Sequence, residues 1–237
     1  MKINNKVFNI EESMARVDRI LSDDNKLIVT NENFNIGNLN YNQTAIIKAA
    51  CMSITLLVNK YDLDHDERVF QQYKCILSEF GAVINECQEA LEFNVAAVKI
   101  FSSLFILNEK NADSIIDTAA KISSLSSILN TKFSRNDLVK IPISIGVSYD
   151  TIKITREAFN ETVDDEFLWM GDALEESIAL SQKSALGFLS NSLYISKKTY
   201  EKLSDKYRSF FNYDNNSDCF TSSLINRNLE DWSKQYF

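Results

Sequence analysis

The sequence contains few of the residues that interrupt regular structure, since its 237 residues include five glycines and one proline. Long structureless linkers are rich in such residues, so the sequence predicts short connections between helices and strands. Histidine is nearly absent as well. The single histidine, His65, offers no catalytic dyad, and neither a Ser/His/Asp arrangement nor a Gly-rich phosphate loop accompanies it. The sequence therefore gives no sign of these common hydrolase and phosphate-binding chemistries.

Long hydrophobic runs are also missing. The longest apolar stretches cover residues 45–58 and 95–107, and both are too short to span a bilayer and contain a lysine. The start, MKINNKVFNIEES, has no apolar segment of the kind that a secretion signal requires. The four cysteines show no CxxC spacing, which is typical of reduced thiols in the cytosol. We therefore expect a cytoplasmic protein without a membrane segment.

Positive charge is scarce, because 25 lysines and arginines stand against 33 aspartates and glutamates, for a formal net charge of −8. The basic residues are scattered singly along the chain. Such a surface repels nucleic acid, so we expect no nucleic-acid partner. Apolar residues, in contrast, are abundant: they make up 45% of the chain, which is enough for one large domain with a sizeable core.

Hydrophobic periodicity assigns helices and strands along the chain. Helices are predicted over residues 10–22, 67–88, 114–133, 172–184 and 197–207, and a last docking helix in NLEDWSKQYF is anchored by Trp232. Strands are predicted over residues 44–59, twice within 89–103 around a tight turn at Asn94, over 141–155 and over 193–196. A polar, Asn-rich loop is expected between the first helix and about residue 42. This order predicts an α+β fold, a two-layer ferredoxin-like split βαβ core with helices on one sheet face.

Four words in this order resemble the class III nucleotide cyclases. They are DTAAKISSLSSILN (117–130), IPISIGVSYD (141–150), LWMGDALEESIAL (168–180) and LYISKKTYEKL (193–203). The resemblance is nearest to the bacterial pyrimidine (cytidylate/uridylate) cyclases of Pycsar phage-defence operons, and it extends from about residue 10 to the end. It implies a cyclase-like domain over residues 41–208, an N-terminal helix and loop extension over 1–40, and a C-terminal strand and helix over 209–237.

The resemblance also implies where metal ligands should lie. Class III cyclases hold two metal ions with two aspartates. The metal ions activate the ribose hydroxyl and neutralise the triphosphate. The first aspartate position matches Ile54, and residues 45–61 contain no carboxylate in any register. The second follows a glycine in a hairpin turn, where this sequence has Asn94-Val95. Hydrocarbon side chains do not coordinate hard cations, so we expect no Mg²⁺ or Mn²⁺ cofactor.

The substrate contacts of the family are altered in the same way. Family members place an asparagine four residues after the glycine of the "GD" helix opening, and often an arginine four residues further on. These positions are Glu175 and Ala179 here, and the base-selecting position is Leu168. A carboxylate at position 175 repels phosphate. We interpret Asp172-x-x-Glu175 instead as a capping box that starts a helix.

Two acidic runs complete the candidates. DLDHDER (62–68) resembles the first half of a calcium-binding loop. Its sixth position is Glu67 rather than glycine and its twelfth is Tyr73, so we interpret it as a solvated turn. The run at residues 161–166 is interpreted as a solvated hairpin tip. A docking loop for a cation or a partner is the alternative for this second run.

These residues favour a pseudoenzyme, a cyclase-like chain that makes no cyclic nucleotide. Because class III sites form across a two-fold dimer interface, the expected partner is a second copy or another cyclase-like chain. The roles left open are a dimeric scaffold, an inhibitory partner or a sensor, in a setting of bacterial phage defence. One alternative is a divergent active cyclase of pyrimidine nucleotides that recruits Asp62, Asp64 or Asp172 as Mg²⁺ or Mn²⁺ ligands. Another is a nucleotide or cyclic-nucleotide sensor without turnover.

Overall fold

A computed structural model describes most of the chain. The residues whose structure it describes are 9–22, 26–29, 34–40, 43–58, 67–97, 100–107, 111–157, 166–183 and 192–236. The chain forms two compact units. The first unit comprises residues 1–48 and 151–171, and the second comprises residues 49–150 and 172–237. The domain limits expected at residues 40 and 208 stay predictions.

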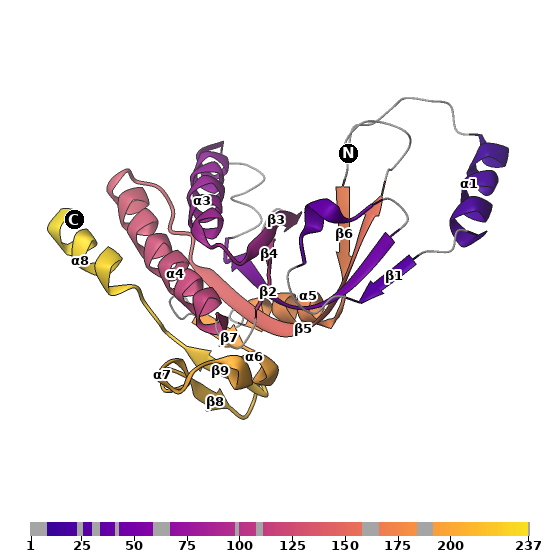
Figure 1. The fold of residues 1–237 in the computed structure, drawn as a ribbon. Helices are drawn as coiled ribbons and strands as arrows, with labels where there is room; N and C mark the ends of the chain where they lie inside the picture. The colour runs from indigo at the N-terminus through magenta and orange to yellow at the C-terminus, as the bar shows by residue number, and fades with distance from the viewer. Residues whose placement is uncertain are drawn as a thin grey trace. The chain divides into compact units, whose positions relative to one another are not determined.

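The second unit is built on a mixed sheet with the strand order β3-β4-β2-β5-β7-β9-β8 (Figure 1). β2 pairs antiparallel with β4, whereas β5 pairs parallel with β7. Helices and strands alternate along the chain, so the predicted α+β class is confirmed. The strands are β2 (Gln43–Leu56), β3 (Ala90–Ala97), β4 (Ile100–Phe105), β5 (Ile143–Glu157), β7 (Ser192–Ile195), β8 (Asn212–Asp214) and β9 (Cys219–Ser222).

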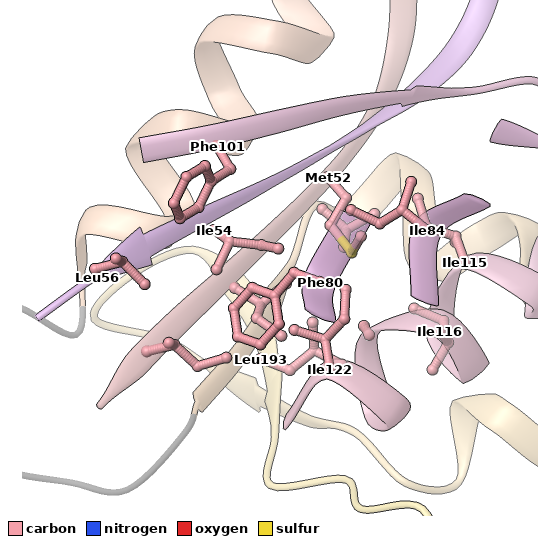
Figure 2. Packing of buried hydrophobic residues seen from close by; sticks show 14 of the residues in the cluster. Met52, Ile54, Leu56, Phe80, Ile84, Phe101, Ile115, Ile116, Ile122 and Leu193 are labelled. Carbon is pink, nitrogen blue, oxygen red and sulfur yellow. The ribbon is translucent and has the colours of Figure 1, made fainter. Parts of the chain in front are cut away.

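Two long helices, α3 (Glu67–Glu86) and α4 (Ala112–Arg135), pack on one face of this sheet. Successive strand residues point to opposite faces, so every second residue of β2 reaches this side. Those residues are large and apolar, and they form one buried cluster with the inner faces of both helices (Figure 2). The cluster includes Met52, Ile54, Leu56, Phe80, Ile84, Phe101, Ile115, Ile116 and Ile122.

The helix predicted over residues 172–184 is present as α5 (Asp172–Gln182), but it packs on the opposite face of the sheet, so the prediction that all helices lie on one face was wrong. The intervening residues of β2 are small and polar here. The Ser53 hydroxyl lies 2.7 Å from that of Ser177, and Thr55 Oγ1 lies 2.7 Å from Ser181 Oγ. Gly146 of β5 permits this close approach, because a Cβ atom there would lie 2.2 Å from the Ser177 carbonyl oxygen.

The C-terminal part of the second unit differs from its prediction at one point. The helix expected over residues 197–207 is interrupted after Lys202, and the backbone N–H of Ser204, at the start of the next helix, donates to Asp113 of α4. The last helix contacts α4, and its Trp232 stacks on Tyr236; that Trp232 anchors the helix stays a prediction. The helices are α6 (Lys197–Lys202), α7 (Asp205–Arg208) and α8 (Arg227–Tyr236), and α8 lies beside α4 (Figure 1).

The first unit contains α1 (Ile10–Ser22), as predicted, and two short strands that pair with extensions of β2 and β5. β1 (Lys26–Val29) pairs parallel with the start of β2, and β6 (Glu166–Met170) pairs antiparallel with the end of β5. The polar loop expected to continue to about residue 42 therefore holds a strand and a short 3-10 helix, η1 (Ile36–Asn38). The apolar run Leu27–Val29 was too short to be recognised as a strand among its polar neighbours. None of the helices described in either unit is long and apolar enough to cross a membrane.

Candidate functional site

Ile54, the position matched to the first metal aspartate, lies inside the core. It pairs with Phe101 across the β2–β4 ladder, and both side chains are fully buried. Figure 2 shows Ile54 with Phe80 and Phe101 in the layer between the sheet and the helices. This environment is apolar, so a carboxylate placed there would lose its hydration.

Val95, the second predicted position, lies on the same row of the sheet. It too pairs with Phe101, so register places Val95 and Ile54 on either side of that residue. Val95 is 47% exposed, because β3 is at the end of the strand order. The structure therefore places Ile54 and Val95 in one row across the sheet, with Ile54 buried and Val95 partly exposed to solvent.

The hairpin turn itself was predicted in the wrong place. Asn94 lies within β3 and pairs with Ser102, and the strand continues to Ala97 while β4 starts at Ile100. A register irregularity between Val95 and Ala97 lengthens this strand, which residue spacing alone does not reveal. Only residues 98–99, a valine and a lysine, remain between the strands, and they lie outside the described residues. Neither is a carboxylate.

Glu92 is the one carboxylate in the sequence from residue 90 to residue 107. It lies on β3 and accepts a hydrogen bond from Asn94 Nδ2 at 2.9 Å. Its register partner on β4 is Leu104, three positions along that strand from the Phe101 row. The hairpin thus supplies no second ligand beside Ile54.

The substrate-helix positions lie at the start of α5. Asp172 and Glu175 are in the first helical turn, and Ala179 follows two turns later, all three exposed. Carboxylates at this end are favoured by the helix dipole, in agreement with a role in starting the helix. The capping box itself stays a prediction. Leu168 lies in the first unit, on β6 opposite Thr155, and is 42% exposed.

Sequence reasoning missed a polar cluster next to the start of α5. Lys198 forms an ion pair with the mostly buried Asp150 in the middle of β5, and Ser148 donates a hydrogen bond to Glu176. The hydrogen bond to Asp150 raises the pKa of Lys198, and the charges of Asp150, Glu176 and Asp172 act in the same direction. The Lys198 ammonium is thus already paired with a protein carboxylate. The negative charges of Asp150, Glu176 and Asp172 around it repel a triphosphate.

The signal for this cluster was present in the sequence. Residues 143–150 alternate between apolar core residues and small polar ones, and Asp150 ends this run on the polar side. The two lysines that open α6 follow the next strand of the parallel pair β5–β7. Val147 pairs with Ile195, and Asp150 and Lys198 each lie three residues beyond that pair, so the acid and the base are expected to meet.

A metal centre does not form among the residues whose structure is described. No group of three or more histidine, cysteine, aspartate or glutamate side chains there is arranged to hold an ion. Asp62, Asp64 and His65 lie outside those residues, as does the acidic run up to Asp165. All four cysteines carry free thiols, and burial raises the pKa of Cys51 to about 11. The residues present at the expected metal positions therefore do not fit Mg²⁺ or Mn²⁺.

Known proteins show the same fold. A class III adenylyl cyclase-like ATP-binding protein from Pseudomonas aeruginosa superposes with a TM-score of 0.69 at 14% identity, over 94% of this chain. This chain spans about half of that protein, 48% of its length. A bacterial light-regulated adenylyl cyclase superposes with a TM-score of 0.62 at 13% identity, over 95% of this chain and 65% of its own. No family model matches the sequence.

A sequence relative agrees with these structures. The uridylate cyclase of Gulbenkiania mobilis is 23% identical over 212 residues, which cover 85% of this chain and 81% of the relative. This chain thus has the fold of the class III nucleotide cyclases and is similar in sequence to a uridylate cyclase. Within this fold, hydrocarbon side chains, Ile54 and Val95, occupy the positions that the resemblance assigned to the metal ligands.

Proposed function

We propose that this cyclase homology domain does not cyclise nucleotides and acts through binding, as a dimeric scaffold, an inhibitory partner or a sensor. The observation that carries the proposal is the burial of Ile54, which is 0% exposed within an apolar cluster. The 16 residues from Gln43 to Val58 contain no carboxylate. The strand expected to bind metal therefore offers the ion no anionic ligand.

Charge supports the same proposal. A nucleoside triphosphate carries about four negative charges, and metal ions normally neutralise them during catalysis. This chain has a formal net charge of −8, and Lys198 next to α5 is already paired with Asp150. Binding a triphosphate at the start of α5 without metal would oppose both Glu175 and the overall field.

The dimer follows from the resemblance to class III cyclases, whose sites combine two chains. With the metal positions and the α5 positions both altered, a homodimer of this chain has neither half of a catalytic site. A heterodimer with an active relative would keep each site half complete, which suits an inhibitory partner better than an activator. A role in phage defence is the setting that the Pycsar resemblance implies.

Turnover tests the proposal. Purified chain would be incubated with ATP, GTP, CTP and UTP in turn, with Mg²⁺ or Mn²⁺, and products separated by mass spectrometry. We expect no cyclic mononucleotide above the level of a matched reaction with EDTA. Metal-dependent formation of any of the four cyclic products would contradict the proposal, and denatured chain provides the control for carried-over enzyme.

The relative named uridylate cyclase favours a second candidate, an active cyclase of pyrimidine nucleotides. This candidate requires metal-binding carboxylates from other segments of the chain. The alternative ligands that the sequence offers are Asp62, Asp64 and Asp172. If it is correct, UTP or CTP turnover should disappear in the Asp62→Asn, Asp64→Asn double variant and persist when Asp18 of α1 is changed to asparagine. The absence of turnover in the unaltered chain would exclude it.

The structural relative described as an ATP-binding protein favours a third candidate, nucleotide binding without turnover. Ligand at about 100 times its Kd stabilises a protein by roughly 2.7 kcal/mol, which a thermal unfolding curve resolves. Under this candidate, one nucleotide raises the melting temperature and is recovered unchanged. Equal curves with all four nucleotides and their cyclic monophosphates would exclude it.

A further inference from the structure

Helix α1 of the first unit presents an apolar face that stays exposed. Ile10, Met14 and Val17 recur at the spacing of one helix face, and these side chains are between 41% and 57% exposed. The helix has 13 residues. A helix this short is marginal in water and gains most of its stability from packing of its apolar face. An apolar surface is therefore needed to hold α1 in place.

Strand β6 presents a second exposed apolar face in the same unit. Its sequence from Phe167 to Met170 is apolar throughout, which is typical of a strand covered on both faces. On one face, Trp169 pairs with Ile154, and both side chains are buried. On the other face, Leu168 and Met170 are 42% and 48% exposed. Among the described residues, this second face lacks the cover that its composition predicts.

Charged residues beside these two faces have opposite signs. Lys153 of β5 pairs with Met170, so its side chain lies on the same face of the sheet, and it is exposed. On α1, Glu11 lies three residues before Met14, next to the apolar face, and it is exposed as well. An α1 helix laid over Leu168 and Met170 can therefore place Glu11 beside Lys153. Apolar contact and charge favour the same docked arrangement.

We propose that α1 of one chain docks on the β5–β6 face of a second copy, the surface formed by Lys153, Leu168 and Met170. A second copy is the occupant because both complementary faces belong to one unit of the chain and both remain exposed in it. In a two-fold pair, each copy supplies one helix and one β5–β6 face, so the contact forms twice. The repeat doubles the apolar area and the number of Glu11–Lys153 ion pairs.

This docking rests on the dimer of the proposed function, whereas the absence of turnover does not depend on it. Leu168 is the position that the resemblance assigned to base selection. A docked α1 would cover this side chain, so a nucleotide base and the α1 helix of the second copy would compete for one surface. Assembly through α1 would therefore oppose nucleotide binding there.

Analytical ultracentrifugation of the full chain tests the docking through Met14→Glu, which places a charge in the middle of the α1 face. Glutamate is a good helix former, so α1 itself is retained. We expect the unaltered chain to dimerise and Met14→Glu to raise the dimer Kd about 100-fold. The reason is a roughly tenfold loss, about 1.4 kcal/mol, at each of the two symmetric contacts.

Ala15→Glu is the matched control, because it adds the same charge to the next exposed residue, about 100° further around the helix. It should leave the dimer Kd unchanged. A monomeric unaltered chain would overturn the docking together with the proposed dimer. A dimer with equal Kd values in the two variants would overturn the docking alone and leave the dimer in place.

Carbodiimide cross-linking identifies the occupant of the β5–β6 face. Chains labelled with nitrogen-15 would be mixed with unlabelled chains, and native mass spectrometry would verify that mixed dimers have formed. The reagent joins a carboxylate to an amine in direct contact, so we expect peptides that link Glu11 of one isotope to Lys153 of the other. Glu12, on the far side of α1, should form no such link. Links within one isotope alone would place α1 on its own chain, and either this result or the absence of a Glu11–Lys153 link would overturn the proposal.

Discussion

The two faces of the sheet in the second unit are built from opposite kinds of side chain. On the α3 and α4 side, β2 contributes Met52, Ile54 and Leu56 to an apolar cluster. On the α5 side, the same strand contributes Ser53 and Thr55, whose hydroxyls bond to serines of the helix. One face is thus held by apolar burial and the other by short hydrogen bonds and close backbone approach. The position assigned to a metal ligand belongs to the apolar face, where stability and not chemistry decides the residue.

The largest loss of stability is expected when a carboxylate is introduced on that apolar face. Ile54→Asp should destabilise the second unit by at least about 4 kcal/mol, because it buries an unpaired charge and removes core volume. Urea unfolding followed by circular dichroism measures this. Ile54→Val, which keeps an apolar side chain, should lower the free energy of unfolding by only about 0.5–1.5 kcal/mol. If Ile54→Asp were as stable as Ile54→Val, the position would be open to solvent and our assignment of Ile54 to the core would be wrong.

The next largest effect belongs to the α5 face. A Cβ atom at Gly146 would lie 2.2 Å from the Ser177 carbonyl oxygen and 2.5 Å from the Ser181 nitrogen, both backbone atoms that cannot rotate away. Gly146→Ala should therefore lose about 2–3 kcal/mol of unfolding free energy as α5 is displaced. Gly81→Ala is the control, since its Cβ would have only ordinary contacts in α3. It should gain about 0.5–1 kcal/mol from helix propensity. Equal stability of the two variants would show that α5 does not pack closely.

A smaller, pH-dependent effect is expected from Cys51 on the same face. Burial raises its pKa from 9.0 to about 11, so the folded state holds the proton more tightly than the unfolded state. Its contribution to stability is complete below pH 9 and is lost as the pH rises through about 11. The stability difference between the unaltered chain and Cys51→Ala should narrow over this interval. A difference that stays constant from pH 8 to pH 11 would show that the thiol is not desolvated.

The smallest effect is expected at Val95. This side chain is 47% exposed on β3, so Val95→Asp should change the unfolding free energy by no more than about 0.5 kcal/mol. Chemical denaturation in parallel with Ile54→Asp measures it. A loss of several kcal/mol would mean that Val95 is covered in solution, for example by a second copy of the chain.

Much of the fold followed from the sequence because the apolar pattern is strong. The helices predicted over residues 67–88 and 114–133 match α3 and α4 within two residues at each end, since each helix buries one face. The alternation along β2 was present too, but its small polar residues were not recognised as a second packing face. Serine is ordinarily a surface residue, so only the partner helix reveals why Ser53 is buried.

The candidate site was harder to predict because it depends on register. The turn at Asn94 was misplaced, since a bulge near Val95 extends β3 and residue type alone does not locate bulges. Asp150 and Lys198 are 48 positions apart and meet only through the parallel pair β5–β7. Ile54 was matched to a ligand position by resemblance, and the structure adds that its side chain is enclosed by the helical layer.

Binding of Mn²⁺ measured by electron paramagnetic resonance, with and without UTP or CTP, tests the central claim most directly. Free Mn²⁺ gives a sharp spectrum that disappears on binding, so the assay reports the ion and not the product. With Ile54 enclosed by hydrocarbon, the number of ions bound per chain should be the same with and without added nucleotide, after subtraction of the Mn²⁺ that the nucleotide binds in protein-free buffer. Nucleotide-dependent uptake of one or two Mn²⁺ ions by the unaltered chain would contradict the account.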